Sequence, residues 1–344
     1  MTPLISVLAG DAEIEALLSD EAQLAAMLRF ERALALASAR IGWIGDDAAQ
    51  SVVGAVERFQ PDWSVLIEGM GRDGVVIPAL VKQLRQNVSE PDRSALHKGA
   101  TSQDVIDTAL VMQIAQVLDV LQARLAALIT KLGEMRAEVG NKPVMAHTRM
   151  QAALPTSWDA KIASWTEPLQ RHSNTFERLR DSVLVVQLGG PVGDRASFGG
   201  HGDALAAALA RELGLGIAGP WQAARDQIVE FGDTLARLTG TLGKLGTDIT
   251  LLAQTEVAAI RLEGGGGSSA MAHKSNPVRA EVLVALGRFN AGLAGTLQQA
   301  MLHEYERSGA AWMLEWLVLP QMMVTGGAAL AQASALLGQV RVES

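Results

Sequence analysis

The longest helical pattern in the sequence runs from Asp104 to about Val139. Its apolar residues recur at helical spacing over almost the whole stretch: Val105, Ile106, Ala109, Leu110, Met112, Ile114, Val117, Leu118, Leu121, Leu125, Leu128, Ile129 and Leu132. This stripe is too wide for one buried face, so it predicts a helix that is buried on more than one side. Such a helix gains its stability from packing, and we expect it to lie among other long helices.

Four further helical patterns follow it in the chain. They run from about Ser157 to Leu184, from Gln222 to Leu262, from Val278 to about His303, and from about Ala310 to the end. Pro168 predicts a kink or an end in the first of these. Gly232, Gly240, Gly243 and Gly246 cost helix stability, and such glycines are typical of a close approach by a neighbouring helix. Together the five patterns predict an elongated five-helix bundle.

The first hundred residues contain shorter helical patterns that are broken by glycine and proline. We therefore predict an all-α chain with a smaller N-terminal helical domain at 1–103 and an oligomerising long-helix bundle at 104–344. Long helices with apolar residues on two faces are poorly buried in a monomer, so we expect a homo-oligomer.

Composition narrows the function classes. Aromatic residues make up only 4%, which suits packed helices better than sheets. The net charge of -8 argues against general nucleic-acid binding, and an anionic ligand would need a local basic pocket. The absence of cysteine excludes disulfides, thiolate metal sites and cysteine nucleophiles. The N-terminus has no signal-peptide pattern, and no long apolar run predicts a membrane span. We expect a cytoplasmic protein with no nucleic-acid or membrane partner.

A glycine-rich loop separates two of the long helices and reads GGGGSSAMAHKSNPVRAE from Gly264 to Glu281. Glycines expose backbone amides that can bind a carboxylate or an oxyanion. Ser268 and Ser269 supply hydroxyls, Lys274 supplies a positive charge, and Asn276 supplies an amide just before a helix. A solvated Gly/Ser linker is the alternative, but the AMAHKSNP continuation favours an active-site loop.

Two other polar breaks carry candidate residues. HKGATSQD, from His97 to Asp104, places Thr101 and Ser102 at a helix N-terminus, which can bind an anion. Plain N-capping also accounts for these two hydroxyls, although it leaves His97 and Lys98 unexplained. MAHTRMQ, from Met145 to Gln151, crowds four polar residues between two helices: His147, Thr148, Arg149 and Gln151. The alternative there is a surface turn.

The remaining signals are weaker. Six glycines and Arg195 between Gly189 and Gly202 indicate either a lid or a packing turn. Glu304, Arg307 and Glu315 are either pocket residues or part of a solvated face. The histidines are scattered, and neither a GxGxxG nor a GxxxxGK[ST] motif occurs, so no metal site or cofactor is predicted.

The loop resembles the signature of the fumarase/aspartase superfamily, G-S-S-x-M-P-x-K-x-N-P. Gly267, Ser268, Ser269, Met271, Lys274, Asn276 and Pro277 all stand at matching positions. HKGATSQDVIDT is similar to the first conserved block of that superfamily, and MAHTRMQAALP occupies the place of the second. QLGGPVGDRASFG and ERSGAAWMLEWLVLP look most like the branch of 3-carboxy-cis,cis-muconate cycloisomerases, which lactonise that tricarboxylate in protocatechuate (β-ketoadipate) catabolism.

The resemblance implies a homotetramer whose active sites draw on three subunits, with no cofactor. It implies that Ser268 is the catalytic serine and that Lys274 and Asn276 bind a substrate carboxylate. Thr101 and Ser102 then bind another carboxylate. Thr148 and Gln151 line the pocket, and Glu281 matches a helix carboxylate of the adenylosuccinate-lyase branch.

Two departures bear on the reaction. Ala272 replaces the usual proline, and Arg149 stands where the lyases carry a histidine acid. Lactonisation needs no acid for a leaving group, because the nucleophile is a carboxylate of the substrate, and an arginine suits a tricarboxylate. The proton donor stays open between Ser268 and Lys274. We also expect the C-terminal domain of the superfamily to be absent or vestigial. The alternatives are an adenylosuccinate- or argininosuccinate-type lyase and a non-catalytic helical assembly protein.

Overall fold

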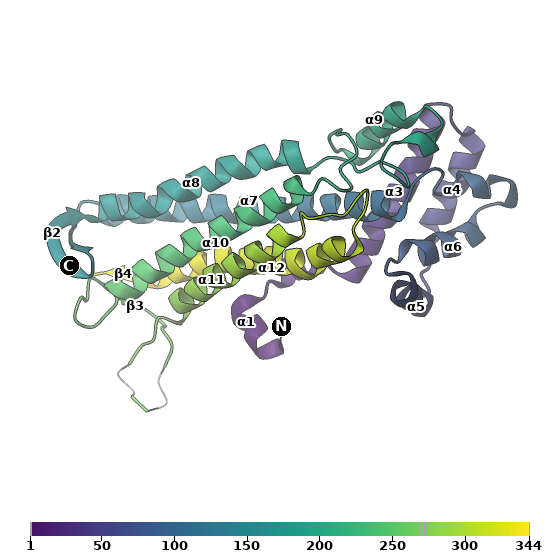
Figure 1. Ribbon diagram of the computed structural model, residues 1–344. Coiled ribbons are helices and arrows are strands. Elements are labelled where there is room, and N and C mark those ends of the chain that lie inside the picture. The colour runs from purple at the N-terminus through teal and green to yellow at the C-terminus, as the bar shows by residue number, and fades with distance from the viewer. Residues whose placement is uncertain (1, 268–269, 272–273, 344) are drawn as a thin grey trace.

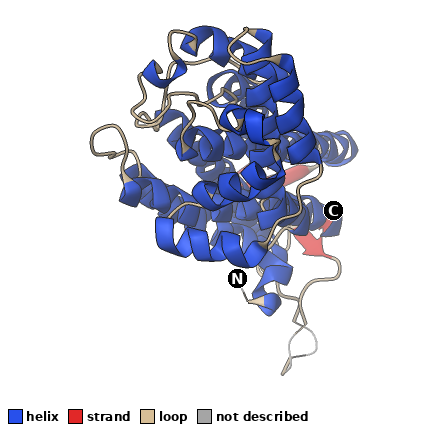
Figure 2. Ribbon diagram, turned by 90° about the vertical axis from the view of Figure 1, so that its right-hand side faces the viewer, coloured by secondary structure: helices blue, strands red, loops and turns tan. Residues whose placement is uncertain are grey.

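The computed structural model describes residues 2–267, 270–271 and 274–343. Five long helices lie along one common axis (Figure 1). They are α7 (Ser102–Val139), α8 (Trp158–Val183), α10 (Asp226–Leu252), α11 (Val278–Gln299) and α12 (Gly309–Gln339). Strands, which are red in Figure 2, make up only a small part of the chain. The predicted long-helix architecture is therefore confirmed for the described part of the chain.

Side-chain contacts fix the directions of these helices. The Asp107 carboxylate accepts from the Trp312 indole (2.9 Å), and Lys131 donates to the Ser334 carbonyl (2.6 Å), so α7 and α12 run the same way. Arg136 near the end of α7 binds Asp159 at the start of α8, which makes those two helices antiparallel. We call the end of the bundle that holds Thr101 the Thr101 end. The opposite end, where α7 passes into a β-hairpin, is the hairpin end.

Glycines bring α10 and α11 close together. A Cβ atom built on Gly246 would lie 2.6 Å from the Ala280 carbonyl oxygen, and one on Gly243 would lie 3.3 Å from the Leu283 carbonyl oxygen. The predicted close approach is confirmed at these two positions. It is also confirmed at Gly232, where a Cβ would overlap the Leu297 Cδ2 atom. A Cβ on Gly240 would itself meet nothing within 4 Å, although the Gly240 Cα lies only 3.5 Å from a Cβ built on Gly287.

Shorter helices make up most of the rest of the described fold. Those at the Thr101 end are α3 (Asp20–Arg40), α4 (Asp46–Glu57), α5 (Trp63–Asp73), α6 (Ile77–Asn87) and α9 (Gly202–Leu213), with 3₁₀ turns at Glu90–Ala95 and Ala196–Phe198. α1 (Pro3–Ala9) and α2 (Ala12–Leu17) pack instead along the bundle, where Gln332 donates to the Leu8 carbonyl and Arg124 pairs with Asp11. A second apolar core, separate from that of the bundle, joins α3, α4 and α6 to the start of α7 and to α9. This core draws on both sides of position 103, and the domain boundary there stays a prediction.

The break at 140–155 is not a loop, and this part of the all-α prediction is wrong. Strands β1 (Pro143–Thr148) and β2 (Gln151–Ser157) form an antiparallel hairpin. Arg149 and Met150 make its turn, with φ of 48° and 66°. Left-handed backbone at both central residues is the geometry of a tight two-residue hairpin turn. The usual sequence signal for such a turn is Asn-Gly, so the Arg-Met pair did not predict it.

One helix boundary differs clearly from the prediction, whereas α8 keeps its predicted range of about 157–184. α10 ends at Leu252 rather than Leu262, because the chain turns at Ala258 (φ 44°) and forms β3 (Ile260–Leu262) against β4 (Val340–Val342). α8 continues through Pro168. Proline removes one helical hydrogen bond, but Trp165 and Leu169 beside it are almost fully buried and hold the helix in place.

α12 is the one described helix with the length and hydropathy of a membrane span, and 67% of its most apolar window is buried inside the protein. Its buried apolar residues from Val318 to Leu337 belong to the bundle core. α12 is therefore a core helix.

Candidate functional site

Thr101 and Ser102 lie at the N-terminus of α7, as predicted. Asp104, which is fully buried, accepts hydrogen bonds from the backbone amides of Thr101 (3.0 Å), Gly189 (2.7 Å) and Gly190 (3.0 Å). Burial raises the pKa of Asp104, and these hydrogen bonds offset part of that rise. The carboxylate thus joins the HKGATSQD block to the glycine-rich segment after Gly189, which packs here as a turn.

Arg307 supplies a positive charge beside Thr101. Its guanidinium donates to the Thr101 hydroxyl (3.3 Å), to the Gln103 side-chain oxygen (2.9 Å) and to the Pro191 carbonyl (3.2 Å). A guanidinium next to the amides of a helix N-terminus is an arrangement that binds a carboxylate. The sequence left Arg307 open between a pocket and a solvated face, and only its position as the single basic residue of the ERSG segment could have drawn attention to it.

His97 and Lys98 are both engaged by the protein itself. The His97 Nδ1 lies 2.6 Å from an oxygen of Glu31, a fully buried side chain whose other oxygen has no hydrogen-bond partner among the described residues. Burial lowers the pKa of His97, but the charge and hydrogen bond of Glu31 outweigh it and leave the pKa raised. Lys98 lies over the Trp43 ring (4.5 Å) and donates to the Trp43 carbonyl (3.2 Å).

A buried ion-pair network joins α7, α10 and α12 near the Thr101 end. Arg225 donates to Asp107 (2.6 Å) and to Glu315 (2.8 Å through Nε), and all three side chains are fully buried. Glu315 is therefore neither a pocket residue nor part of a solvated face. A buried guanidinium needs such paired carboxylates, because leaving one unpaired is very costly.

At the hairpin end, the MAHTRMQ residues project from β1, β2 and the turn between them. His147, Thr148, Arg149 and Gln151 are all exposed. His147 and Arg149 line a cavity of about 400 Å³ between the hairpin and the end of α10, together with Lys161 and Gln254. Asp248 also lines the cavity, so Arg149 and Lys161 outnumber the one carboxylate, and the cavity can accept an anionic ligand.

The glycine-rich loop also starts and ends at the hairpin end. Ser268 and Ser269 lie outside the described residues. Lys274 is exposed, and Asn276 exchanges backbone hydrogen bonds with Gly266 (2.7 and 2.9 Å), which closes the base of the loop. Glu281 is exposed in the first turn of α11.

The predicted site residues that the structure describes therefore fall into two sets at opposite ends of the bundle. His97, Lys98, Thr101 and Ser102 lie at the Thr101 end, and the hairpin residues lie at the other end with Lys274, Asn276 and Glu281. The 38 residues of α7 between the two sets, at 1.5 Å each, place them about 57 Å apart. One chain does not bring its own candidate residues together.

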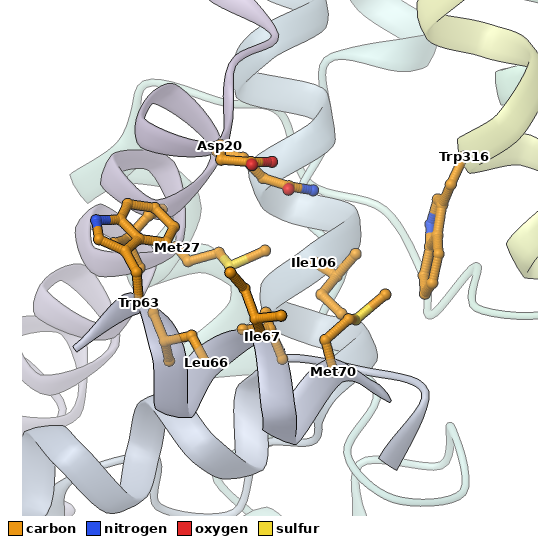
Figure 3. Close-up of a pocket in the computed structure, with 11 residues that line it drawn as sticks. Asp20, Met27, Trp63, Leu66, Ile67, Met70, Ile106 and Trp316 are labelled. Carbon is orange, nitrogen blue, oxygen red and sulfur yellow. The ribbon is translucent and has the colours of Figure 1, made fainter. Parts of the chain in front are cut away.

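An apolar pocket of about 250 Å³ opens between α3, α5, α7 and α12 (Figure 3). Its walls are Met27, Leu66, Ile67, Met70 and Trp316, with Asp20 beside them. It contains none of the predicted site residues, and its apolar lining does not suit a polycarboxylate.

No cluster of three or more histidine, aspartate or glutamate side chains able to hold a metal ion occurs within 2–267, 270–271 and 274–343.

Comparison with known proteins gives consistent matches. A family model described as "Lyase" matches residues 15–288. The 3-carboxy-cis,cis-muconate cycloisomerase of Pseudomonas aeruginosa is 38% identical over 97% of this chain and 74% of its own length. The 3-carboxy-cis,cis-muconate lactonizing enzyme of Pseudomonas putida superposes with a TM-score of 0.90 at 34% identity, covering 99% of this chain and 77% of that one. A fumarate lyase from a Mesorhizobium species also reaches 0.90, at 33% identity, over 97% and 76% of the two chains.

Proposed function

The chain belongs to the lyase family, and on that premise we propose that it is a cycloisomerase that lactonises 3-carboxy-cis,cis-muconate. The observation that carries the proposal is the similarity, over nearly the whole chain, to enzymes named for this reaction. The cationic groups at both ends of the bundle suit a substrate with three carboxylates in a protein of net charge -8.

The chemistry needs few protein groups. One substrate carboxylate attacks a carbon of the conjugated diene, and the π electrons move to the carbon beside another carboxylate. The enolate-like dianion that results must be stabilised and then protonated on carbon. Arg307 with Thr101 and Ser102, and Arg149 with His147, supply the anion-binding groups. Asn276 and Lys274 complete the set, and Gln151, Thr148, Ser269 and Glu281 line the pocket. The proton donor is Ser268 or Lys274.

The proposed active site forms between chains. Because the two half-sites are about 57 Å apart along α7, the Thr101 end of one subunit meets the hairpin end of others. Exposed apolar side chains on the bundle, among them Phe289, Met313 and Leu317, are available for such packing. A homotetramer with antiparallel neighbours in the cytoplasm satisfies both requirements.

An ultraviolet assay tests the activity directly. The purified protein should consume 3-carboxy-cis,cis-muconate with loss of diene absorbance, and the product should be the lactone. Ser268→Ala should reduce turnover by orders of magnitude without changing the oligomer mass. Inertness toward the diene would refute the proposal, and near-normal activity of Ser268→Ala would assign proton donation elsewhere.

A fumarate-releasing lyase is the second candidate, because a fumarate lyase superposes equally well. Arg149 counts against it, since an arginine is a poor acid for an amine leaving group. Release of fumarate from a succinyl compound, with no action on the diene, would favour this second function.

A further inference from the structure

Three cationic side chains and a histidine gather in a groove between α8 and α10. The groove has a volume of about 510 Å³ and is lined by Arg171, His172, Thr175, Arg237, Thr241 and Lys244, with Pro168 and Gly240. Arg171 lies about 20 Å from the start of α8 at 1.5 Å per residue. The groove is therefore remote from both half-sites of the proposed active site.

The positive charge of this groove is poorly compensated. Lys244 is paired with Asp248, whose carboxylate also accepts from the Trp165 indole (2.7 Å). Among the residues that the structure describes, neither Arg171 nor Arg237 has a carboxylate within ion-pair distance. Two uncompensated arginines side by side repel each other, and a protein of net charge -8 has acidic residues to spare for neutralising them.

The floor of the groove is also unusually open. Gly240 lies in the middle of α10, where a glycine costs about 1 kcal/mol relative to alanine. A Cβ there would meet nothing within 4 Å. A side chain at this position would therefore have room, and the glycine leaves the backbone of α10 exposed at the floor of the groove.

The protonation of the His172 ring depends on the charges in the groove. Its Nε2 lies 2.9 Å from the Thr241 hydroxyl, which itself donates to the Arg237 carbonyl (3.1 Å). The hydroxyl therefore accepts from Nε2–H, and the Nδ1 lone pair stays free in the neutral ring. Burial, Arg237 and Arg171 lower the pKa of His172. Lys244 also lines the groove, and its charge is paired with Asp248 outside it.

We propose that this groove is a binding site for a small multivalent oxyanion, held by Arg171, Arg237 and Lys244. The shared ligand chemistry is that of a phosphate or a polycarboxylate. A bound anion neutralises the arginines, so His172 takes up a proton and donates from Nδ1 to the ligand. Binding should therefore strengthen as the pH falls through the pKa of His172 and weaken with added salt.

The test uses the full-length oligomer and two probes, inorganic phosphate and citrate. Calorimetric titrations at pH 6 and pH 8 measure the affinity. NMR follows the ring resonances of His172, which are identified by their absence from the spectrum of His172→Gln. We expect saturable binding and an upward shift of the His172 pKa. Because both probes lose negative charge between pH 8 and pH 6, the effect of His172 is the affinity ratio between the two pH values, which should favour pH 6 more in the wild type than in His172→Gln. Binding of citrate but not phosphate would assign the site to polycarboxylates, and the reverse to phosphates.

Variants separate this site from non-specific attraction. Arg171→Gln and Arg237→Gln should each weaken binding about tenfold, the value of one charge-assisted contact. Arg288→Gln on α11 is the matched control, because Arg288 is also exposed but lies outside the groove, and it should leave binding unchanged. Equal loss in all three variants would overturn the proposal. No binding of either probe would also overturn it, and a smaller oligomer in Arg171→Gln would then assign the groove to a subunit interface.

Discussion

Gly246→Ala should destabilise the protein although it adds a better helix former. The new Cβ would lie 2.6 Å from the Ala280 carbonyl oxygen and 3.0 Å from the Leu283 Cβ, so α10 and α11 must separate by several tenths of an ångström. Overpacking of this kind costs about 1–3 kcal/mol, and the gain in helix propensity returns about 1 kcal/mol. The net expected loss is therefore up to about 2 kcal/mol.

Gly133→Ala is the matched control. Gly133 is exposed inside α7, and a Cβ there would meet nothing within 4 Å. The Gly133→Ala variant should gain about 1 kcal/mol of folding stability from helix propensity alone. Urea unfolding, followed by circular dichroism at one fixed protein concentration, measures both variants. Equal stabilisation by the two substitutions would refute the claim that glycines set the distance between α10 and α11.

Three further predictions concern the Thr101 end. Because the pKa of His97 is raised by Glu31 in the folded protein, the pair stabilises fully below the unfolded histidine pKa of about 6.5, and this contribution is lost as the pH rises through the folded pKa. Glu31→Gln should therefore destabilise more at pH 6 than at pH 9 in urea unfolding, and an equal effect at both would contradict the pairing. Asp107→Asn should lower the free energy of unfolding by about 3–5 kcal/mol, since it breaks a buried ion pair of Arg225. A variant that unfolds at the wild-type temperature would contradict a stabilising role for this network. Arg307→Lys should raise KM for the tricarboxylate about tenfold or more by losing the fork of donors to substrate, whereas a loss confined to kcat would exclude a role in ground-state binding.

The helical bundle could be predicted because local pattern and tertiary packing agree in it. The stripe from Val105 to Leu132 is buried along α7, as its width indicated. The hairpin could not be predicted, because its turn is made by Arg149 and Met150 in left-handed backbone. Pairing between β1 and β2 fixes that conformation, and neither residue signals it.

The candidate site was predictable only in part, for a physical reason. Thr101 and Ser102 carry a local signal, since hydroxyls before an apolar run indicate a helix N-terminus. The bonds of Arg307 to Thr101 and of Glu31 to His97 join residues that are far apart in the chain. Only the folded arrangement creates them, and composition or spacing gives no sign of such pairs.

The sharing of one active site between chains is the central claim, and hybrid oligomers test it most directly. Arg307→Ala disables the Thr101 end, and Ser268→Ala disables the loop at the hairpin end. After the two inactive proteins are unfolded together and refolded as a mixture, random assembly should restore about a quarter of the wild-type activity toward 3-carboxy-cis,cis-muconate, because about one site in four then joins two intact ends. No recovery at any mixing ratio, with hybrid oligomers demonstrated by mass, would show that each site comes from a single chain and would contradict the account.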